Sequence, residues 1–298
     1  MRGGQCAKAC PYSAINNFIR PCVRSCKADA IHMAETGEAE IDYEKCVSCG
    51  ACVTQCPFGA TVDKSYITNL IDMIKGSEGN TKYKVNAIIA PAFVSQFDYA
   101  TIGQVIQGLR ELGFEGIYEA AQGADLVAYY EAKELEEKGF LTTSCCPAFV
   151  EYIEKNFPDL VPNISHNLSP MGTIGKIIKD EDPTCKNIFI GPCTAKKAEF
   201  QLERVKDYID CVITFEELQA LFDSKDIDIE NLESTPIDDA TPFGRGFAKS
   251  GGVAAAVVEA LIEQGSDFVP DTVAVEGLDK CKPVLMRASR GMLKNNLI

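Results

Sequence analysis

Short apolar runs alternate with longer amphipathic stretches over most of the chain, from about residue 79 to residue 298. A continuous apolar run of roughly four to eight residues is typical of a buried strand, and apolar residues at helical intervals are typical of a helix. The predicted strands are Lys84–Ala90, Gly116–Glu119, Phe140–Ser144, Asn187–Ile190, Cys211–Thr214 and Thr272–Val275. The predicted helices are Ile102–Leu112, Leu126–Lys138, Glu216–Phe222 and Val253–Gln264, with a last helix after Val275. This alternation predicts an α/β domain with parallel sheets.

The first 78 residues follow another pattern and predict a separate small α+β domain. Two segments, Cys6–Ile15 and Cys22–Ile31, echo a third, Cys52–Thr61. Each has two cysteines separated by three residues, then a small residue and a strand-like end. The turn-rich run Ser77–Asn80 is the best candidate for a linker. The predicted domains are therefore 1–78 and 79–298.

Composition and charge narrow the class of protein. The chain is 46% hydrophobic and 24% charged, and its net charge is −14. No apolar stretch approaches the roughly 18 residues of a membrane span, and the N-terminus has no hydrophobic signal region. The charge argues against nucleic acid or an anionic membrane as a partner. Fourteen cysteines in a chain with no export signal indicate metal ligands and a cytoplasmic location, because the cytosol keeps thiols reduced.

The N-terminal cysteines match an iron–sulfur pattern. The run from Cys46 to Pro57 has the form C-x2-C-x2-C-x3-C-P, in which three thiolates bind one cluster and the fourth reaches a second. A zinc site is the alternative, but zinc spacings are typically paired C-x2-C units. Eight cysteines suffice for two [4Fe–4S] clusters in a ferredoxin-like domain. One cluster is assigned to Cys26, Cys46, Cys49 and Cys52, and the other to Cys6, Cys10, Cys22 and Cys56.

Other readings of this region stay open. The chain could hold one cluster and four structural cysteines. Arg20, Arg24 and Lys27 form either a solvated face or a docking site for an acidic redox partner.

Two further cysteine motifs lie downstream, each between a predicted strand and a predicted helix. Cys145 and Cys146 precede Pro147, which suits the first position of a helix, and Cys193 precedes Thr194 in the same way. A third helix is expected to start after Ser250-Gly251-Gly252. Helix amides at such starts favour thiolates and bind anions, so the three starts predict a pocket for an anionic cluster. Taken singly, each cysteine could equally be a buried core thiol or lie at a helix cap.

The segments Thr143–Pro147 and Gly191–Glu199 together resemble the first two signature segments of [FeFe]-hydrogenases. The runs Phe243–Arg245 and Ser250–Val253 and the ferredoxin-like domain in front fit the same family. Ala148-Phe149 after Pro147 resembles a divergent subgroup of it. The resemblance implies a catalyst that interconverts protons, electrons and H2 at an H-cluster, a [4Fe–4S] cluster joined to a diiron centre.

The resemblance also implies roles for single residues. Cys146 and Cys193 would bind the cluster, Cys145 would exchange protons, and Lys196 would hydrogen-bond a cyanide. Pro91, Ser250 and Gly251 would line the cofactor pocket. Glu131, Glu134 and Ser165 would form a proton relay. Apart from the resemblance, the two glutamates share one helix face, which is more often simply an exposed face.

One departure affects the expected activity. The family takes two more cluster cysteines from a C-terminal segment, and this sequence reaches Ile298 first. We therefore expect a fragment that cannot hold the complete active cluster by itself. Cys185, Cys211 and Cys281 are interpreted as structural, and His32 and His166 as too separated for a metal site.

Three functions compete at this stage. The leading one is an [FeFe]-hydrogenase, or part of one, whose expected partners are ferredoxin or another redox protein and the factors that insert its clusters. The second is a hydrogenase-like protein of iron–sulfur assembly or redox sensing. The third is a plain electron-transfer protein without diiron chemistry.

Overall fold

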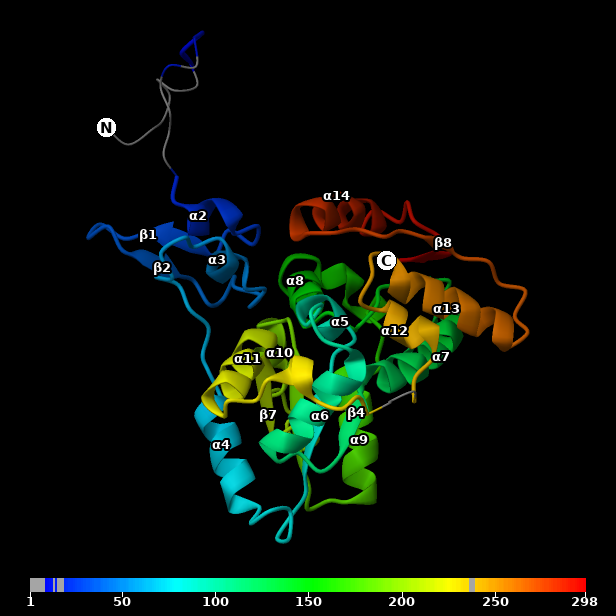
Figure 1. Ribbon diagram of the computed structural model, residues 1–298. Helices are drawn as coiled ribbons and strands as arrows, with labels where there is room; N and C mark the ends of the chain where they lie inside the picture. Colours follow the sequence, from blue (N-terminus) through cyan, green and yellow to red (C-terminus); the bar gives the residue numbers. More distant parts are fainter. Residues whose placement is uncertain (1–8, 13, 15–18, 236–238) are drawn as a thin grey trace. The chain divides into compact units, whose positions relative to one another are not determined.

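The computed structural model describes residues 9–12, 14, 19–235 and 239–298 and divides the chain into two compact units (Figure 1). The smaller unit comprises Met1–Cys46 and Gly50–Asp63, and the larger unit comprises Val47–Cys49 and Lys64–Ile298. The boundary at Asp63 corrects the predicted boundary at residue 78. Helix α4 (Ile67–Gly76) belongs to the larger unit because Tyr66 and Leu70 are buried in its core.

The smaller unit contains short helices and one hairpin. Its elements are α2 (Pro21–Ser25), β1 (Ile31–Met33), β2 (Ala39–Ile41) and α3 (Ala51–Thr54). β1 and β2 pair antiparallel, with His32 opposite Glu40. This is the expected α+β organisation around cysteine-bearing turns.

The larger unit is built on a four-stranded parallel sheet in the order β4-β3-β6-β7. The chain leaves the central strand β3 to one side for β4 and later returns to its other side for β6. Adjacent parallel strands whose connections leave in opposite directions form a crevice at their carboxyl ends, where ligands bind in such folds. The strands are β3 (Val85–Ile89), β4 (Ile117–Glu119), β6 (Lys186–Gly191) and β7 (Cys211–Thr214).

A second parallel sheet has three strands of only two residues each. They are β5 (Phe140–Leu141), β8 (Asp271–Thr272) and β9 (Asn296–Leu297), and β9 lies between the other two. The last residue is tied to this sheet, since the Ile298 N–H donates to the Leu141 oxygen at 3.0 Å and the Ile298 oxygen accepts from the Thr143 N–H at 2.9 Å. The carboxyl ends of β5 and β9 therefore lie side by side.

Helices pack against both sheets (Figure 1). α7 (Ala120–Lys138) connects two hydrophobic cores, because Ala120 is buried with the four-stranded sheet and Leu135 is buried with the second sheet. It packs against α9 and α13. The other elements of the unit are α5 (Phe93–Gln96), α6 (Ile102–Leu112), α8 (Pro147–Asn156), η1 (Pro158–Asn163), α9 (Pro170–Glu181), α10 (Ala195–Glu199), α11 (Phe215–Ser224), η2 (Ile229–Asn231), α12 (Pro242–Gly246), α13 (Gly252–Glu263) and α14 (Leu278–Ala288).

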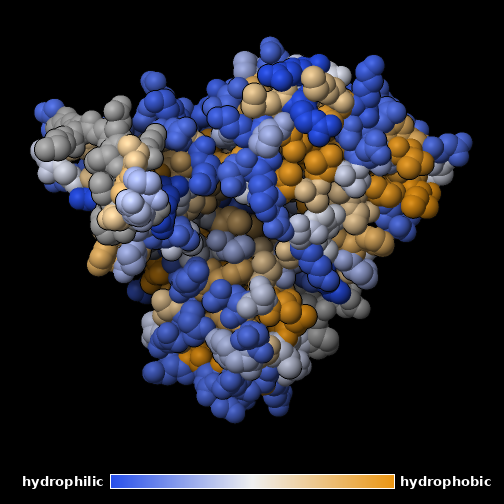
Figure 2. Space-filling model, turned by 90° about the horizontal axis from the view of Figure 1, so that it is seen from above, coloured by the Kyte–Doolittle hydropathy of each residue, from blue (hydrophilic) through white to orange (hydrophobic). Residues whose placement is uncertain are grey.

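The prediction of an α/β fold with parallel sheets is confirmed. α7 begins at Ala120, earlier than the predicted Leu126, because Gly123 and Ala124 at its start pack in the core. The predicted strands at Phe140–Ser144 and Thr272–Val275 are shorter in the structure, where β5 and β8 have two residues each. Among the described helices, none is long and apolar enough to cross a membrane. Figure 2 shows a surface that is mostly hydrophilic, with hydrophobic side chains in separate patches.

The start of α13 depends on the close approach of two glycines. A Cβ atom added to Gly252 would overlap the carbonyl oxygen of Gly246, whereas a Cβ on Gly246 would meet no atom within 4 Å. We expect Gly252→Ala to lower the free energy of unfolding by about 1–3 kcal/mol, the usual cost of overpacking. Chemical denaturation measures the loss, and Gly246→Ala is the matched control. Equal stabilities of the two variants would contradict this packing.

Candidate functional site

The loop after β5 carries the first cysteine motif of the larger unit. Pro147 begins α8 as predicted, and Cys146 is the N-cap residue. Cys145 is half-buried, and Cys146 is exposed. The Glu131 carboxylate of α7 supports the loop, because its Oε1 accepts hydrogen bonds from the Ser144 N–H at 3.0 Å and the Ser144 hydroxyl at 3.3 Å.

The loop after β6 carries the second motif. Cys193 precedes the short helix α10, and Lys196 on this helix donates to the Cys145 carbonyl oxygen at 3.1 Å. This hydrogen bond joins a loop of the four-stranded sheet to a loop of the second sheet. Lys196 also forms a buried ion pair of 2.6 Å with Glu199, which sequence reasoning passed over. The two cysteine motifs therefore converge, as predicted.

The thiols of Cys145 and Cys193 both have raised pKa values. Burial, together with smaller contributions from the nearby Glu131 and Cys146, raises the pKa of Cys145 to about 12. Burial also raises the pKa of Cys193, with a second contribution from Cys146. These raised pKa values run against the expectation that helix amides favour thiolates here, because desolvation disfavours the charged form. Cys145 is consequently a thiol that keeps a proton within the loop.

Cys281 on α14 is a third cysteine near this point. Burial raises its pKa, and Cys146 is the next cause of the increase, so the two sulfurs lie within electrostatic range of each other. The sequence predicts only that Cys281 lies in a helix. Its proximity to Cys146 depends on the tertiary fold. Cys185 and Cys211 are buried elsewhere, at the start of β6 and in β7.

Glu131 is the most unusual acid of the region. It is fully buried, and its Oε2 has no hydrogen-bond partner among the residues that the structure describes. Burial raises its pKa to about 7, although hydrogen bonds from Ser144 and Ser165 partly offset the effect. A carboxyl group with this pKa can both take up and release a proton near neutral pH.

Glu134, one turn further along α7, has the opposite character. Burial disfavours its charge, but hydrogen bonds from Lys138 and His166 outweigh this and lower its pKa. The Asn167 amide donates to the Ser165 hydroxyl oxygen at 3.0 Å and to Glu134 Oε2 at 3.3 Å. The structure thus brings the predicted relay residues Glu131, Ser165 and Glu134 close together in one polar row, in which Asn167 donates to both Ser165 and Glu134.

The raised pKa of Glu131 predicts how stability depends on pH. The folded protein holds a proton on Glu131 up to about pH 7, whereas the ordinary pKa of the group is 4.5. The stabilising effect of this proton is fully present below pH 4.5 and is lost as the pH rises through about 7. At about 1.4 kcal/mol per pH unit, we expect wild type to lose about 3 kcal/mol relative to Glu131→Gln over this interval. Denaturation at several pH values measures it, and parallel curves would contradict it.

The remaining predicted pocket residues lie at two other loop ends. The N–H of Ala90 donates to the Ile190 oxygen at 2.8 Å, so Pro91 follows β3 beside the end of β6. Ser250 and Gly251 precede α13, with Gly251 as its N-cap at φ 74°. Neither Ser250 nor Gly251 has a backbone hydrogen bond to the cysteine loops within the described parts of the chain. Pro91 is thus placed at the predicted crevice, and Ser250 and Gly251 only at the predicted helix start.

A buried ion pair positions the turn before α13. Arg245 of α12 donates to both carboxylate oxygens of Glu119, at 2.8 Å each. Glu119 ends β4 and is buried. This two-bond geometry fixes the direction of the guanidinium as well as its distance, so α12 is anchored to the carboxyl edge of the sheet.

The cysteine turns of the smaller unit repeat in structure as they do in sequence. The Cys26 sulfur accepts a 3.2 Å hydrogen bond from the N–H four residues later, and the Cys56 sulfur accepts one of 3.3 Å at the same place. The residue before that N–H is left-handed in both copies, Asp29 at φ 52° and Gly59 at φ 60°. N–H groups directed at sulfur stabilise a thiolate, the form that binds iron.

The other predicted ligands of this region are placed as follows. Cys10, Cys22, Cys46 and Cys52 are in the smaller unit, and Cys49 lies in the short stretch that belongs to the larger unit. Cys6 lies outside the described residues. Backbone N–H groups of Phe58, Thr61 and Ala60 lower the pKa of Cys56. The donor set of this turn therefore fits an iron–sulfur cluster.

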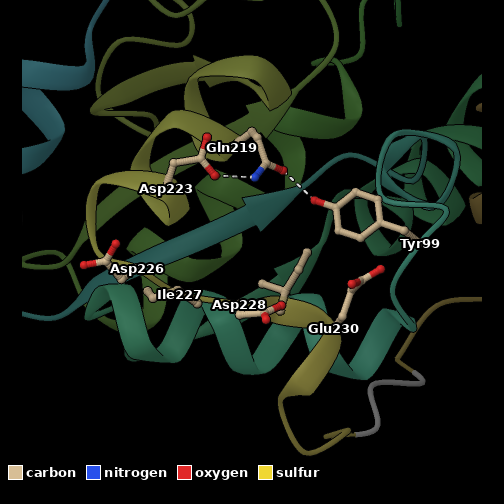
Figure 3. A pocket seen from close by; sticks show the side chains of 8 residues that line it. Tyr99, Gln219, Asp223, Asp226, Ile227, Asp228 and Glu230 are labelled. Carbon is tan, nitrogen blue, oxygen red and sulfur yellow. Dashed lines mark hydrogen bonds between the residues drawn. The ribbon is translucent and has the colours of Figure 1, made fainter.

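A cavity of about 600 Å³ lies away from all of these groups, beside α11 (Figure 3). Tyr99 donates to Gln219 at 2.5 Å, and Gln219 donates to Asp223 at 2.8 Å. Burial raises the pKa of Tyr99, and Asp223 and Glu230 add to the effect. The carboxylates that line the cavity, Asp223, Asp226, Asp228 and Glu230, make it unfavourable for anionic ligands.

Comparisons with known protein families match most of the chain. Residues 83–298 match the model of the iron only hydrogenase large subunit, C-terminal domain, and residues 39–61 match the 4Fe-4S binding domain. The second match gives a [4Fe–4S]-binding function to the segment with Cys46, Cys49, Cys52 and Cys56.

Individual relatives are of two kinds. Iron hydrogenase 1 of Clostridium pasteurianum is 32% identical over 71% of this chain and 41% of its own length. The cytosolic Fe-S cluster assembly factor NAR1 of Kluyveromyces lactis is 25% identical over 95% of this chain and 68% of its own length. This chain thus spans less than half the length of the iron hydrogenase that it matches.

Solved structures show the same fold. The [FeFe]-hydrogenase HydA1 from Chlamydomonas reinhardtii matches with a TM-score of 0.61 and 21% sequence identity, over 78% of this chain and 81% of that chain. At this identity the match bears on the fold and leaves the chemistry to the residues of the site.

Proposed function

We propose that this chain, which belongs to the iron-only hydrogenase large-subunit family, catalyses the reversible reduction of protons to H2 in its complete form. Its N-terminal [4Fe–4S] clusters would deliver the electrons. The proposal is supported above all by the polar row that leads from Cys145 towards the surface. A hydrogenase must carry protons through a dry interior, where an isolated charge is very costly.

The row has the properties that proton transfer requires. Cys145 keeps its proton, and Glu131 next to it has a pKa of about 7. The unpartnered Oε2 of Glu131 is a free site for a proton or a water molecule. Ser165 and Asn167 connect Glu131 to Glu134. Glu131, Ser165 and Glu134 can each exchange a proton, whereas the Asn167 amide only donates here and holds Ser165 and Glu134 in place.

The residues of the converging loops suit the family's metal centre. Cys146 and Cys193 would bind the cluster, and Lys196 would hydrogen-bond a cyanide of the diiron centre. When bound, this centre supplies the redox chemistry of H2. Lys196 is positioned for this hydrogen bond, because Glu199 and the Cys145 carbonyl oxygen already hold its ammonium group in place. Pro91, Ser250 and Gly251 would line the pocket.

We further propose two [4Fe–4S] clusters near the N-terminus. The repeated N–H···S turns at Cys26 and Cys56 support this, because the assignment places these two cysteines in different clusters. The first cluster would use Cys26, Cys46, Cys49 and Cys52. The second would use Cys6, Cys10, Cys22 and Cys56.

The number of clusters can be measured by iron content. We expect the double variant Cys10→Ala/Cys22→Ala of the whole chain to lose about four irons on anaerobic reconstitution and to keep the other N-terminal cluster. Cys46→Ala/Cys49→Ala is the reciprocal variant. The EPR spectrum of wild type should show the interaction of two clusters, and each double variant should remove it. Unchanged iron in the first variant would contradict the second cluster.

The proposed partners follow from the same chemistry. Ferredoxin or another redox protein would exchange electrons with the N-terminal clusters, and dedicated factors would insert the clusters and the diiron centre. Arg20 and Arg24 would present positive charge to an acidic partner. A cytoplasmic location is part of the proposal, as is the absence of nucleic-acid and membrane binding in a chain with a net charge of −14.

A second candidate function is iron–sulfur cluster assembly. It is favoured by the relative NAR1, which matches 95% of this chain and more of its own length than the iron hydrogenase does. An assembly factor would need the cysteines but no proton row. H2 turnover of the complete, matured protein decides between the two. Turnover that depends on Cys145 and Glu134 supports the hydrogenase, whereas iron binding without any turnover supports the assembly factor.

A further inference from the structure

The polar row ends at the surface in a pair of side chains, Glu134 and His166. Glu134 Oε1 lies 2.5 Å from His166 Nδ1. The backbone N–H of His166 also donates to both carboxylate oxygens, at 3.3 and 3.2 Å. His166 directly follows Ser165 in the chain, so the same short segment holds both Ser165 and Glu134. The imidazole is therefore held at the outer end of this row by its own contacts with Glu134.

Exposure rises steadily along the row. Glu131 is 0% exposed, the Glu134 side chain is 13% exposed, and the His166 side chain is 75% exposed. A proton that leaves Glu131 for Glu134 is still inside the protein. At His166 it reaches a group whose ring is mostly in water.

The contact between Glu134 and His166 must contain a proton. A carboxylate oxygen only accepts hydrogen bonds, and at 2.5 Å either Nδ1 or the carboxyl group carries the hydrogen between them. The two groups thus form a donor–acceptor pair whose proton can move from one heavy atom to the other.

Lys138 is the other charged group at this pair. Its ammonium lies 2.7 Å from Glu134 Oε1, 2.9 Å from the Pro162 oxygen and 3.3 Å from His166 Nδ1. An ammonium group holds its proton at neutral pH, whereas imidazole exchanges one there. Lys138 thus keeps Glu134 ionised and ready to accept, and the exchange itself falls to the imidazole.

We propose that His166 is the residue at which the proton row exchanges protons with water. The inference rests on the proposed function. In the direction of H2 formation, Nε2 takes a proton from a solvent hydronium ion, which becomes water, and the Nδ1 proton passes to Oε1 of the Glu134 carboxylate. Neutral imidazole and a carboxylic acid result, and no electron moves. The ring regains its first tautomer by exchange with water. H2 oxidation runs through the same steps in reverse.

A matched control is provided by the chain itself, which contains only two histidines. His32 Nε2 lies 3.1 Å from Glu40 Oε2, and both side chains are about 60% exposed (61% and 60%). His32 therefore has the same kind of partner, but it lies on the β-hairpin of the smaller unit and outside the proton row.

The kinetic test uses the complete, matured protein in dilute buffer. We expect His166→Ala to lower H2 turnover by about tenfold or more, with unchanged iron content. Added imidazole should restore most of the rate, because a small base can replace the missing ring, and the optimum of the pH profile should shift. His32→Ala should behave as wild type. Normal turnover of His166→Ala, or a slow variant that imidazole does not rescue, would overturn the inference.

A second readout needs no metal centre. In the iron-free whole chain, the ring nitrogen signals of the two histidines report their hydrogen bonds by NMR. We expect Glu134→Gln to change the His166 signal and leave the His32 signal, and Glu40→Gln to do the reverse. If the His166 signal does not change in Glu134→Gln, the hydrogen bond between Glu134 and His166 is absent and the inference is overturned. An intact pair in a protein without H2 turnover would overturn the proposed function instead.

Discussion

Replacing Cys145 by alanine is expected to lower H2 turnover of the matured protein at least about a hundredfold, with iron content and cluster spectra unchanged. The reason is the position of the thiol. The pKa of Cys145 is raised to about 12, so the thiol keeps its proton, and it lies next to the predicted ligand Cys146. In the proposed site Cys145 is not itself a ligand. Its loss would separate the metal centre from Glu131, which is the first carboxyl group of the row.

Related variants sharpen this expectation. Cys145→Asp should keep more activity than Cys145→Ala, because a carboxyl group can still pass a proton. Glu134→Gln should also slow turnover without loss of iron. Two outcomes would refute the role of Cys145: loss of iron in Cys145→Ala, which would make it a ligand, or near-normal turnover, which would move the proton path elsewhere.

Replacing Cys193 by alanine is expected to remove the iron of the larger unit and with it all measurable H2 turnover. Cys193 follows β6 at the edge where β3 also ends, and Cys146 is an electrostatic neighbour. A thiolate that binds the cluster cannot be replaced by a methyl group. The N-terminal clusters should stay, because their ligands belong to other turns.

The same strand offers the control for this prediction. Cys185 precedes β6 at the opposite end, is fully buried and lies 3.5 Å from Asn187 Oδ1. Cys185→Ser should keep both the iron and the turnover. Iron analysis, EPR spectroscopy and an H2 assay of the two variants make the comparison. Retained iron in the larger unit of Cys193→Ala would rule out Cys193 as a ligand.

The sequence was most informative where strands are buried on both faces. β3, β6 and β7 are short, mostly apolar runs, and all their residues except Lys186 are buried in the structure. Pro147 at the start of α8 and the glycine turn before α13 were also predictable, because proline and glycine have local backbone requirements. These features place both cysteine loops at the edge of the sheets.

The second sheet could not be predicted in the same way. Its strands have two residues each, too few to produce a periodic pattern, and β9 lies in the short run Asn295–Ile298, of which only half is apolar. Their pairing is decided by tertiary contacts between distant segments. α4 was assigned to the wrong unit because only its packing, through Leu70, shows where it belongs.

The site shows the same limit. Residue types and spacing identified Cys145, Cys146, Cys193 and Lys196. The roles of Asn167 and His166, and the approach of Cys281 to Cys146, depend on how loops fold against α7 and α8. The one available signal was that His166 and Asn167 directly follow Ser165.

The pairing of β5 with β9 has a consequence for synthesis of the protein. Phe140 and Leu141 pair in parallel with Asn296 and Leu297. β5 therefore cannot pair with β9 until more than half of the larger unit has been translated after it. Contacts between such distant segments form late in folding. The loop with Cys145 and Cys146 is therefore fixed only after residue 298 has left the ribosome. If the two loops bind one cluster as proposed, metal can join this loop to Cys193 only after β9 has paired with β5.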